Sequence, residues 1–313
     1  MMRLRTIFAC LAAGPLLTAA AAPVRLAPIS KWVLDYADES CRLIRTFGDP
    51  AAPSVLLFER ASPISPLSML VIGKPFKAVQ SGEKLTARFT PPDDIKFDYG
   101  QAATNPTTKE PAILWPGVGF FHVRDAKAPV PEEVQKAMDA AKRGERPPPT
   151  DLAKRATALA EAAALAAQVS AIEVSARQKA PVVLETGAMG RAIQMLNECT
   201  RNQLRGWGVD PDLEDKIVRR PWAAHPDRWF RSSDYPSGGI RSGGESLIEA
   251  RLLVDASGKV TKCTSLSHVN GFEFNRAACD AFTRSGRFAP AELADGTKVP
   301  SYYVQTVRFM MFR

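Results

Sequence analysis

Residues 247–260 read Leu-Ile-Glu-Ala-Arg-Leu-Leu-Val-Asp-Ala-Ser-Gly-Lys-Val, and this stretch decides the fold of the C-terminal part of the chain. Its first half alternates, so one face of an expected strand carries only apolar side chains, those of Ile248, Ala250, Leu252 and Val254. Glu249 and Arg251 fall on the other face. Asp-Ala-Ser-Gly at 255–258 then supplies a hairpin turn, with glycine where a positive φ is needed. The chain returns as a second strand over 260–266.

A helix and a last strand follow this hairpin. Apolar side chains at helical spacing predict a helix with one apolar face, formed by Phe274, Ala277, Ala278, Ala281 and Phe282. Gly286 ends this helix, and Arg-Phe-Ala-Pro-Ala at 287–291 carries the chain back. Pro300 precedes the last strand, expected over 302–312. The sequence therefore predicts a small α+β module in which a helix covers one face of a sheet.

The order of these elements resembles the C-terminal domain of TonB-type energy transducers. The residues that carry the resemblance are Tyr235-Pro236 at the start of the module, Gly258, Phe288, Pro290 and Ala291. The resemblance covers residues 234–313. In that family these positions are structural, so the resemblance implies a binding domain with no catalytic residue.

The resemblance also implies how such a module binds a partner. Members of the family pair an edge strand with an extended peptide, the TonB box of an outer-membrane receptor, through backbone hydrogen bonds. The last strand is the implied edge, and Tyr303, Gln305 and Val307 share one of its faces. We therefore expect these three residues and Tyr235 to contact the partner, with the backbone N–H of Gln305 among the donors. The expected partner is a TonB-box-like receptor peptide or another envelope protein.

The first 22 residues have the organisation of a signal peptide. Arg3 and Arg5 precede an apolar core at 7–17, and small residues follow at 18–22. The uncharged run at 6–22 is 17 residues long, which is the lower limit for a helix that crosses a bilayer, so a short membrane anchor is the alternative. Either interpretation implies export, and we expect the rest of the chain in the periplasm.

Four cysteines follow the signal segment, an even number in a chain expected to be exported. An oxidising compartment favours disulfides, and four cysteines allow three pairings. Cys263 and Cys279 both lie in the C-terminal module, whereas Cys41 and Cys199 both precede it. Pairing within each module therefore gives Cys263–Cys279 and Cys41–Cys199.

Residues 23–208 are expected to form a β-rich module that the Cys41–Cys199 disulfide closes. Short apolar runs between proline and glycine predict strands at 41–45, 55–58, 67–72, 85–89, 117–123, 170–176 and 181–185. A helical insert interrupts the module at 129–168, where Thr150 or Asp151 caps an alanine-rich surface helix over 152–168.

A helix with one apolar face is expected to start at Thr186 or Gly187 and to stop at Trp207-Gly208. Residues 209–233 are interpreted as a linker that packs through its aromatic side chains, with a continuation of the first module as the alternative. The stretches 41–48 and 184–208 also resemble the N-terminal region of exported alphaproteobacterial proteins that carry such a C-terminal domain. That second resemblance implies no activity.

Enzymatic and metal-dependent functions find no support in the sequence. It contains neither G-x-S-x-G nor a P-loop motif, and the Gly/Ser-rich segment 237–244 is expected to be a flexible loop because no strand leads into it. His122, His225 and His268 are isolated and no Cys-x-x-Cys occurs, so we expect no metal site and no cofactor. The net charge of +8 is spread along the chain rather than clustered, which argues against nucleic-acid binding.

Two functions of different classes remain. The first is a periplasmic TonB-like protein that binds partner proteins through its C-terminal domain in TonB-dependent outer-membrane transport. The alternative is a structural or interaction protein of the cell envelope without energy transduction. Membrane-anchored transducers of the family have a long spacer rich in proline, lysine and glutamate, and the short run Pro147-Pro148-Pro149 does not replace it.

Overall fold

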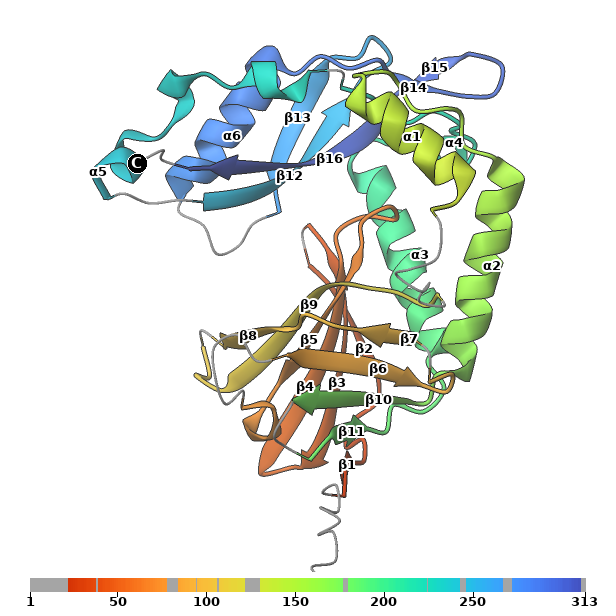
Figure 1. The fold of residues 1–313 in the computed structure, drawn as a ribbon, viewed down its shortest axis with the longest axis vertical. Coiled ribbons are helices and arrows are strands. Elements are labelled where there is room, and N and C mark those ends of the chain that lie inside the picture. The colour runs from red at the N-terminus through yellow and green to blue at the C-terminus, as the bar shows by residue number, and fades with distance from the viewer. Residues whose placement is uncertain are drawn as a thin grey trace, which may run out of the picture.

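The computed structural model describes residues 22–310 except 38, 78–83, 94, 106, 122–129, 177–179, 224, 243–245 and 267–271. Figure 1 shows a β-rich N-terminal module, a smaller C-terminal module, and long helices along one side that run between them. The mixed α+β fold expected from the sequence is confirmed. The expected signal peptide or anchor, and the histidines His122 and His268, lie outside the described residues. No helix in the described ranges is long and apolar enough to cross a membrane.

A six-stranded antiparallel sheet forms one layer of the N-terminal module, in the strand order β2-β3-β4-β5-β9-β8. Its strands are β2 (Val33–Tyr36), β3 (Cys41–Asp49), β4 (Ala52–Arg60), β5 (Leu67–Ile72), β8 (Gln101–Thr104) and β9 (Pro111–Val118). Burial alternates along β4, as expected for a strand with one face on a core.

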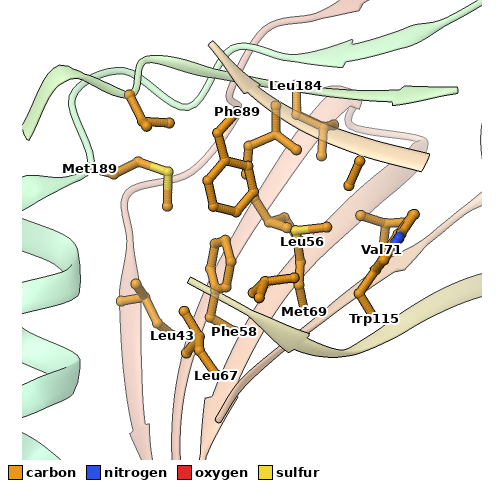
Figure 2. Close-up of a cluster of buried hydrophobic side chains, with 14 of the residues drawn as sticks. Leu43, Leu56, Phe58, Leu67, Met69, Val71, Phe89, Trp115, Leu184 and Met189 are labelled. Atoms are coloured by element: carbon orange, nitrogen blue, oxygen red, sulfur yellow. The ribbon is translucent and has the colours of Figure 1, made fainter. Parts of the chain in front are cut away.

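A second sheet packs on the first and completes a sandwich. Its strand order is β1-β11-β10-β6-β7. The strands are β1 (Val24–Leu26), β6 (Leu85–Thr90), β7 (Ile95–Phe97), β10 (Ala171–Ala176) and β11 (Val182–Leu184), and a 3-10 turn, η1 (Lys74–Phe76), follows β5. Figure 2 shows Phe89 and Leu184 of this sheet facing Leu56 and Phe58 of the other, with the Phe58 and Phe89 ring centroids 6.4 Å apart. These buried side chains form the larger core of the molecule.

Two long helices, α2 (Leu152–Gln168) and α3 (Gly190–Gly206), flank the sandwich, whereas α1 (Glu132–Lys142) lies at the level of the C-terminal module (Figure 1). The side chain of Asp151 caps α2, and most of this alanine-rich helix is exposed. A disulfide joins Cys199 on α3 to Cys41 on β3, which is the pairing expected from the sequence. Gly208, at φ 81°, ends the turn after α3.

The prediction of a strand at 117–123 is wrong. The strand in this region is β9, which ends at Val118. The sequence interpretation treated the prolines as breaks, but Pro111 is the first residue of the strand and Pro116 lies where the register with β5 shifts. A proline is tolerated at both kinds of position because its missing N–H is not needed by the ladder there.

The C-terminal module contains a three-stranded antiparallel sheet in the order β13-β12-β16. Its elements are β12 (Ser246–Val254), β13 (Val260–Ser265), α6 (Phe272–Ser285), the short pair β14 (Ala291–Glu292) and β15 (Lys298–Val299), and β16 (Ser301–Phe309). The four alternating apolar residues of β12 are buried beneath α6, as expected. The hairpin glycine, Gly258, has φ 85°, and a disulfide joins Cys263 on β13 to Cys279 on α6.

The segment between the modules contains three short helical turns: α4 (Pro211–Glu214), η2 (Pro226–Trp229) and η3 (Ser232–Asp234). Its aromatic residues pack on the C-terminal module. Trp229 lies against Phe288, with ring centroids 5.0 Å apart, and Trp222 exchanges two backbone hydrogen bonds with Ala289. This segment therefore adds side chains to the core beneath α6.

The prediction of a flexible loop at 237–244 is also wrong. Residues 237–242 form a short helix, α5 (Ser237–Ser242), and 243–245 lie outside the described residues. A Cβ atom on Gly239 would lie 2.5 Å from the Phe274 ring, and one on Gly238 would lie 2.3 Å from the Glu273 carboxylate. The glycines therefore let this turn lie directly against the start of α6, rather than giving the chain freedom.

Candidate functional site: the open edge of β16

The C-terminal sheet has two edge strands, β13 and β16. β13 is six residues long, and at its hairpin end Lys259 already forms a backbone bridge to Arg287. β16 is a nine-residue strand, and β12 is its only pairing strand within the described part of the chain. An edge strand of this length offers a row of backbone donors and acceptors to a further strand. β16 is therefore the longer docking edge.

The hydrogen-bond phase of β12 determines which backbone groups of β16 point outward. The N–H of Leu266 donates to the carbonyl oxygen of Glu249 over 2.8 Å. In an antiparallel sheet the backbone groups of successive residues point to opposite sides, so odd-numbered residues of β12 face β13 and even-numbered ones face β16. Ala250 lies opposite Gln305. Odd-numbered residues of β16 therefore bond to β12, and even-numbered residues face away from the sheet.

Two further contacts support this phase. The N–H of Asp255 donates to the carbonyl oxygen of Lys259 over 3.0 Å, as expected for odd residues that face β13. The Gln305 side chain donates from Nε2 to the carbonyl oxygen of Thr306 over 2.7 Å, which is consistent with a carbonyl that points out of the β12–β16 ladder. Val304 and Thr306 are therefore the central outward residues of the edge.

The four predicted contact residues all lie on or beside this strand. Tyr303, Gln305 and Val307 share the face of β16 that α6 and the segment before it cover. The Tyr303 ring packs against Phe288, with centroids 5.1 Å apart, and Val307 packs on the same core. Burial raises the pKa of Tyr303. These side chains support the edge from beneath.

Tyr235 lies at the far end of β16. Its ring centroid is 5.8 Å from that of Phe274 and 5.7 Å from that of Phe309, both in edge-to-face geometry. Such aromatic contacts hold the C-terminal end of β16 on the start of α6.

The expectation that the backbone N–H of Gln305 binds the partner is corrected by the register of β16 with β12. This N–H points toward β12 rather than outward, because Gln305 lies opposite an even-numbered residue of β12. The outward donors, those of Val304 and Thr306, were missed. Period-two alternation identifies the face of each side chain, but the direction of each N–H depends on the register with β12, which the sequence does not show.

The other face of the sheet rests on the N-terminal module, and Arg251 is the centre of this contact. Its side chain is 2 % exposed and forms an ion pair with the carboxylate of Glu39. The guanidinium carbon lies 3.5 Å from the centroid of the Trp207 ring. The Arg251 guanidinium also donates a hydrogen bond from Nη1 to the backbone carbonyl oxygen of Glu39 over 3.3 Å. Burial lowers the pKa of Arg251, and the charge of Glu39 opposes that effect.

An apolar cluster continues this contact along β16. The Trp207 ring packs edge-on against Tyr302, with centroids 5.7 Å apart, and Leu204 and Val209 complete the buried cluster. Burial raises the pKa of Tyr302 to about 12, and the nearby charge of Glu214 adds to the shift. The end of α3 thus packs on the first residues of β16, whereas Thr306 stays exposed.

The described residues contain no group of three or more histidine, cysteine, aspartate or glutamate side chains that would hold a metal ion. His225 is exposed. Cys263 is in a disulfide.

Residues 231–311 match the family model described as Gram-negative bacterial TonB protein C-terminal. The C-terminal module is a TonB C-terminal domain. The match begins just before η3 and ends just past β16, so it contains the whole three-stranded sheet and α6. Neither the comparison with curated proteins nor the one with solved structures found a match. The family assignment therefore applies to this domain, and the N-terminal module lies outside it.

Proposed function

We propose that this protein is a periplasmic binding protein of the cell envelope that captures an extended segment of a partner protein on the edge of β16. The observation that carries the proposal is the row of outward backbone groups at Val304 and Thr306 within a TonB C-terminal domain. An added strand gains main-chain hydrogen bonds from such an edge with little demand on its sequence. No step of bond making or breaking is needed.

The first candidate for the partner is the TonB-box-like segment of an outer-membrane receptor, which would place the protein in TonB-dependent transport. The family of the C-terminal domain and the expected signal peptide or anchor support this candidate. Inner-membrane anchoring belongs to the same proposal, because energy transduction needs a link to the inner membrane.

The second candidate is an envelope interaction protein without energy transduction. One observation favours it: the sheet face of the C-terminal domain is held on the N-terminal module through the buried Arg251, rather than lying at the end of a long spacer. Cell fractionation separates the two candidates. Recovery with the inner membrane supports transduction, whereas recovery as a soluble periplasmic protein supports the second candidate.

Binding itself is tested by titrating the mature full-length protein with synthetic peptides copied from the periplasmic ends of outer-membrane receptors. Thr306→Pro removes an outward donor while leaving the β12 ladder intact, so we expect binding to weaken about two- to tenfold. Gln305→Ala keeps every backbone group and should change affinity less. Both variants should melt as cooperatively as the wild type. Equal binding by Thr306→Pro and the wild type would exclude the edge of β16 as the site.

A further inference from the structure

A pocket of about 540 Å³ lies in the N-terminal module, between α2, α3 and the segment that follows β9. One wall is a face of α2 made of four alanines and Leu159, the opposite wall is the face of α3 from Gly190 to Asn197, and residues 117–121 close a third side. Figure 1 shows α2 and α3 side by side along the sandwich. A pocket of this volume has the size of a site for a small molecule.

The alanine-rich sequence of α2 explains why there is space at this place. Ala158, Ala162 and Ala166 recur at every fourth position, so their short side chains share one face of the helix. The two helices are close at one end, because a Cβ atom on Gly190 would lie 3.0 Å from Ala167. From this contact to Asn197 the pocket follows α3 for roughly 10 Å.

The lining of this pocket is almost entirely apolar. Phe120 is buried, whereas Phe121 and Leu159 are exposed, so apolar side chains line the pocket from the core to the surface. Among the described residues that line it, Arg60 alone carries a charge. The guanidinium of Arg60 therefore sets the electrostatic character of the pocket.

Arg60 is the last residue of β4, and its side chain is on the same face of that strand as the buried Phe58. The guanidinium donates from Nη1 to Oδ1 of Asn197 on α3 over 2.6 Å. Asn197 is two residues before Cys199, whose disulfide to Cys41 fixes α3 on β3. The position of Arg60 at the α3 side of the pocket is therefore set by the fold.

The charge of Arg60 has no acidic partner in the part of the chain that the structure describes. Asn197 supplies a neutral oxygen, and the Nε–H of Arg60 is enclosed without an acceptor among the described residues. Burial lowers the pKa of Arg60, and an ionised Tyr302 would oppose that effect. Burial raises the pKa of Tyr302 to about 12, however, so this hydroxyl is neutral near pH 7. Since an enclosed charge is normally paired, the counter-charge is one that a ligand can supply.

We infer that this pocket binds a small aliphatic carboxylate, with the carboxylate on the guanidinium of Arg60 and the hydrocarbon chain along the alanine face of α2. A guanidinium presents parallel N–H donors that match the two oxygens of a carboxylate. The hydrocarbon chain removes the apolar lining from water. A cationic ligand would be repelled by Arg60, and a neutral one would leave its charge unpaired.

The lining also favours a small molecule over a peptide segment. Apart from Arg60, the polar side chains among the described lining residues are those of Gln194 and Asn197. The remaining walls are largely helix faces, whose backbone groups are bonded within the helices. A peptide in this pocket would therefore leave most of its own backbone donors and acceptors unsatisfied.

The first test is calorimetric titration of the mature full-length protein with decanoate and with decanol, its neutral counterpart, both in monomeric solution. The wild type should bind decanoate about tenfold more tightly, because a hydrogen bond between charged groups is added. Arg60→Gln should remove this preference, so that both probes bind alike. Arg205→Gln is the matched control, because Arg205 is exposed on α3 and does not line the pocket, and it should keep the tenfold preference.

A second pair of variants tests the location without changing a charge. Ala158 and Ala160 are both exposed on α2, and only Ala158 lines the pocket. Ala158→Phe places a ring in the pocket and should weaken binding of both probes about tenfold. Ala160→Phe should bind both as the wild type does. The comparison of the two probes on the wild type measures the charge preference even where Arg60→Gln does not fold.

Three results would overturn the inference: absence of decanoate binding by the wild type, equal affinity of the wild type for the two probes, or a preference for decanoate that persists in Arg60→Gln. Unchanged binding by Ala158→Phe would place the decanoate outside this pocket and overturn the inference as well. Thr306→Pro should leave decanoate binding unchanged, because β16 contributes none of the described lining residues. Failure of the edge-binding proposal and failure of this one are therefore distinguishable.

Discussion

Replacing Arg251 with methionine removes the guanidinium that joins the two modules while keeping an unbranched side chain of similar length. In the wild type the guanidinium binds Glu39 and lies 3.5 Å from the ring centroid of Trp207. The charged hydrogen bonds contribute about 1.5–3 kcal/mol and the cation–π contact about 1–2 kcal/mol. The carboxylate left behind is 31 % exposed and regains water, and methionine refills part of the space. The net loss expected is therefore about 2–3 kcal/mol, less than for a fully buried pair.

The assay is urea unfolding of the full-length protein, followed by probes in each module. The contact lies between modules, so its loss should lower the midpoint and separate the two transitions. Arg276→Met is the matched control, because Arg276 is 72 % exposed and forms an ion pair with Asp280 on the same helix, away from the contact between the modules. That variant should stay within about 0.5 kcal/mol of the wild type.

A double-mutant cycle with Glu39→Gln isolates the pair. We expect a coupling energy of about 1–3 kcal/mol between Glu39 and Arg251, since each side chain contacts the other directly. Moderate salt should change this value little, because Arg251 is buried and screened poorly by ions. Loss of stability no larger than in Arg276→Met, or a coupling energy of zero, would refute the role given to Arg251.

The remaining predictions concern stability. Phe282→Ala empties a fully buried aromatic site and should cost about 3–5 kcal/mol in chemical unfolding, and a loss below 1 kcal/mol would show that Phe282 is not in a core. Replacing Cys263 and Cys279 together should lower the free energy of unfolding by about 3 kcal/mol, because the disulfide limits the entropy of the unfolded chain. Peptide mapping that finds either cysteine as a free thiol in the wild type would contradict this prediction. Burial raises the pKa of Tyr302 from 10 to about 12. The protonated Tyr302 hydroxyl therefore contributes fully to the free energy of unfolding below pH 10, and this contribution is lost as the pH rises toward 12. Unfolding free energy should therefore fall more steeply in that window for the wild type than for Tyr302→Phe, and parallel curves would count against a buried hydroxyl.

Local patterns in the sequence were sufficient for most elements of the C-terminal domain. The alternation in β12 predicted the buried face correctly because one face of the strand packs on α6. The apolar spacing from Phe274 to Phe282 predicted α6 for the same reason. Pro116 shows the limit of such patterns, since it lies within β9 at a register shift that depends on the partner strand β5.

Contacts between segments that are distant in the chain could not be predicted from local sequence patterns. Alternation places Arg251 on the face opposite α6, but nothing in the local pattern shows that the N-terminal module covers that face. Glu39 and Trp207 meet Arg251 only through the fold, because they are far from it in sequence. The contact between Arg60 and Asn197 has the same origin.

Amide hydrogen exchange of the full-length protein, with and without bound peptide, tests the central claim most directly. The N–H of Thr306 points away from the sheet, so it should exchange rapidly in the free protein and slowly in the complex. The N–H of Gln305 bonds to β12 and should be protected in both states. Protection of Thr306 in the free protein, or peptide-induced protection that appears on β13 instead, would contradict the account.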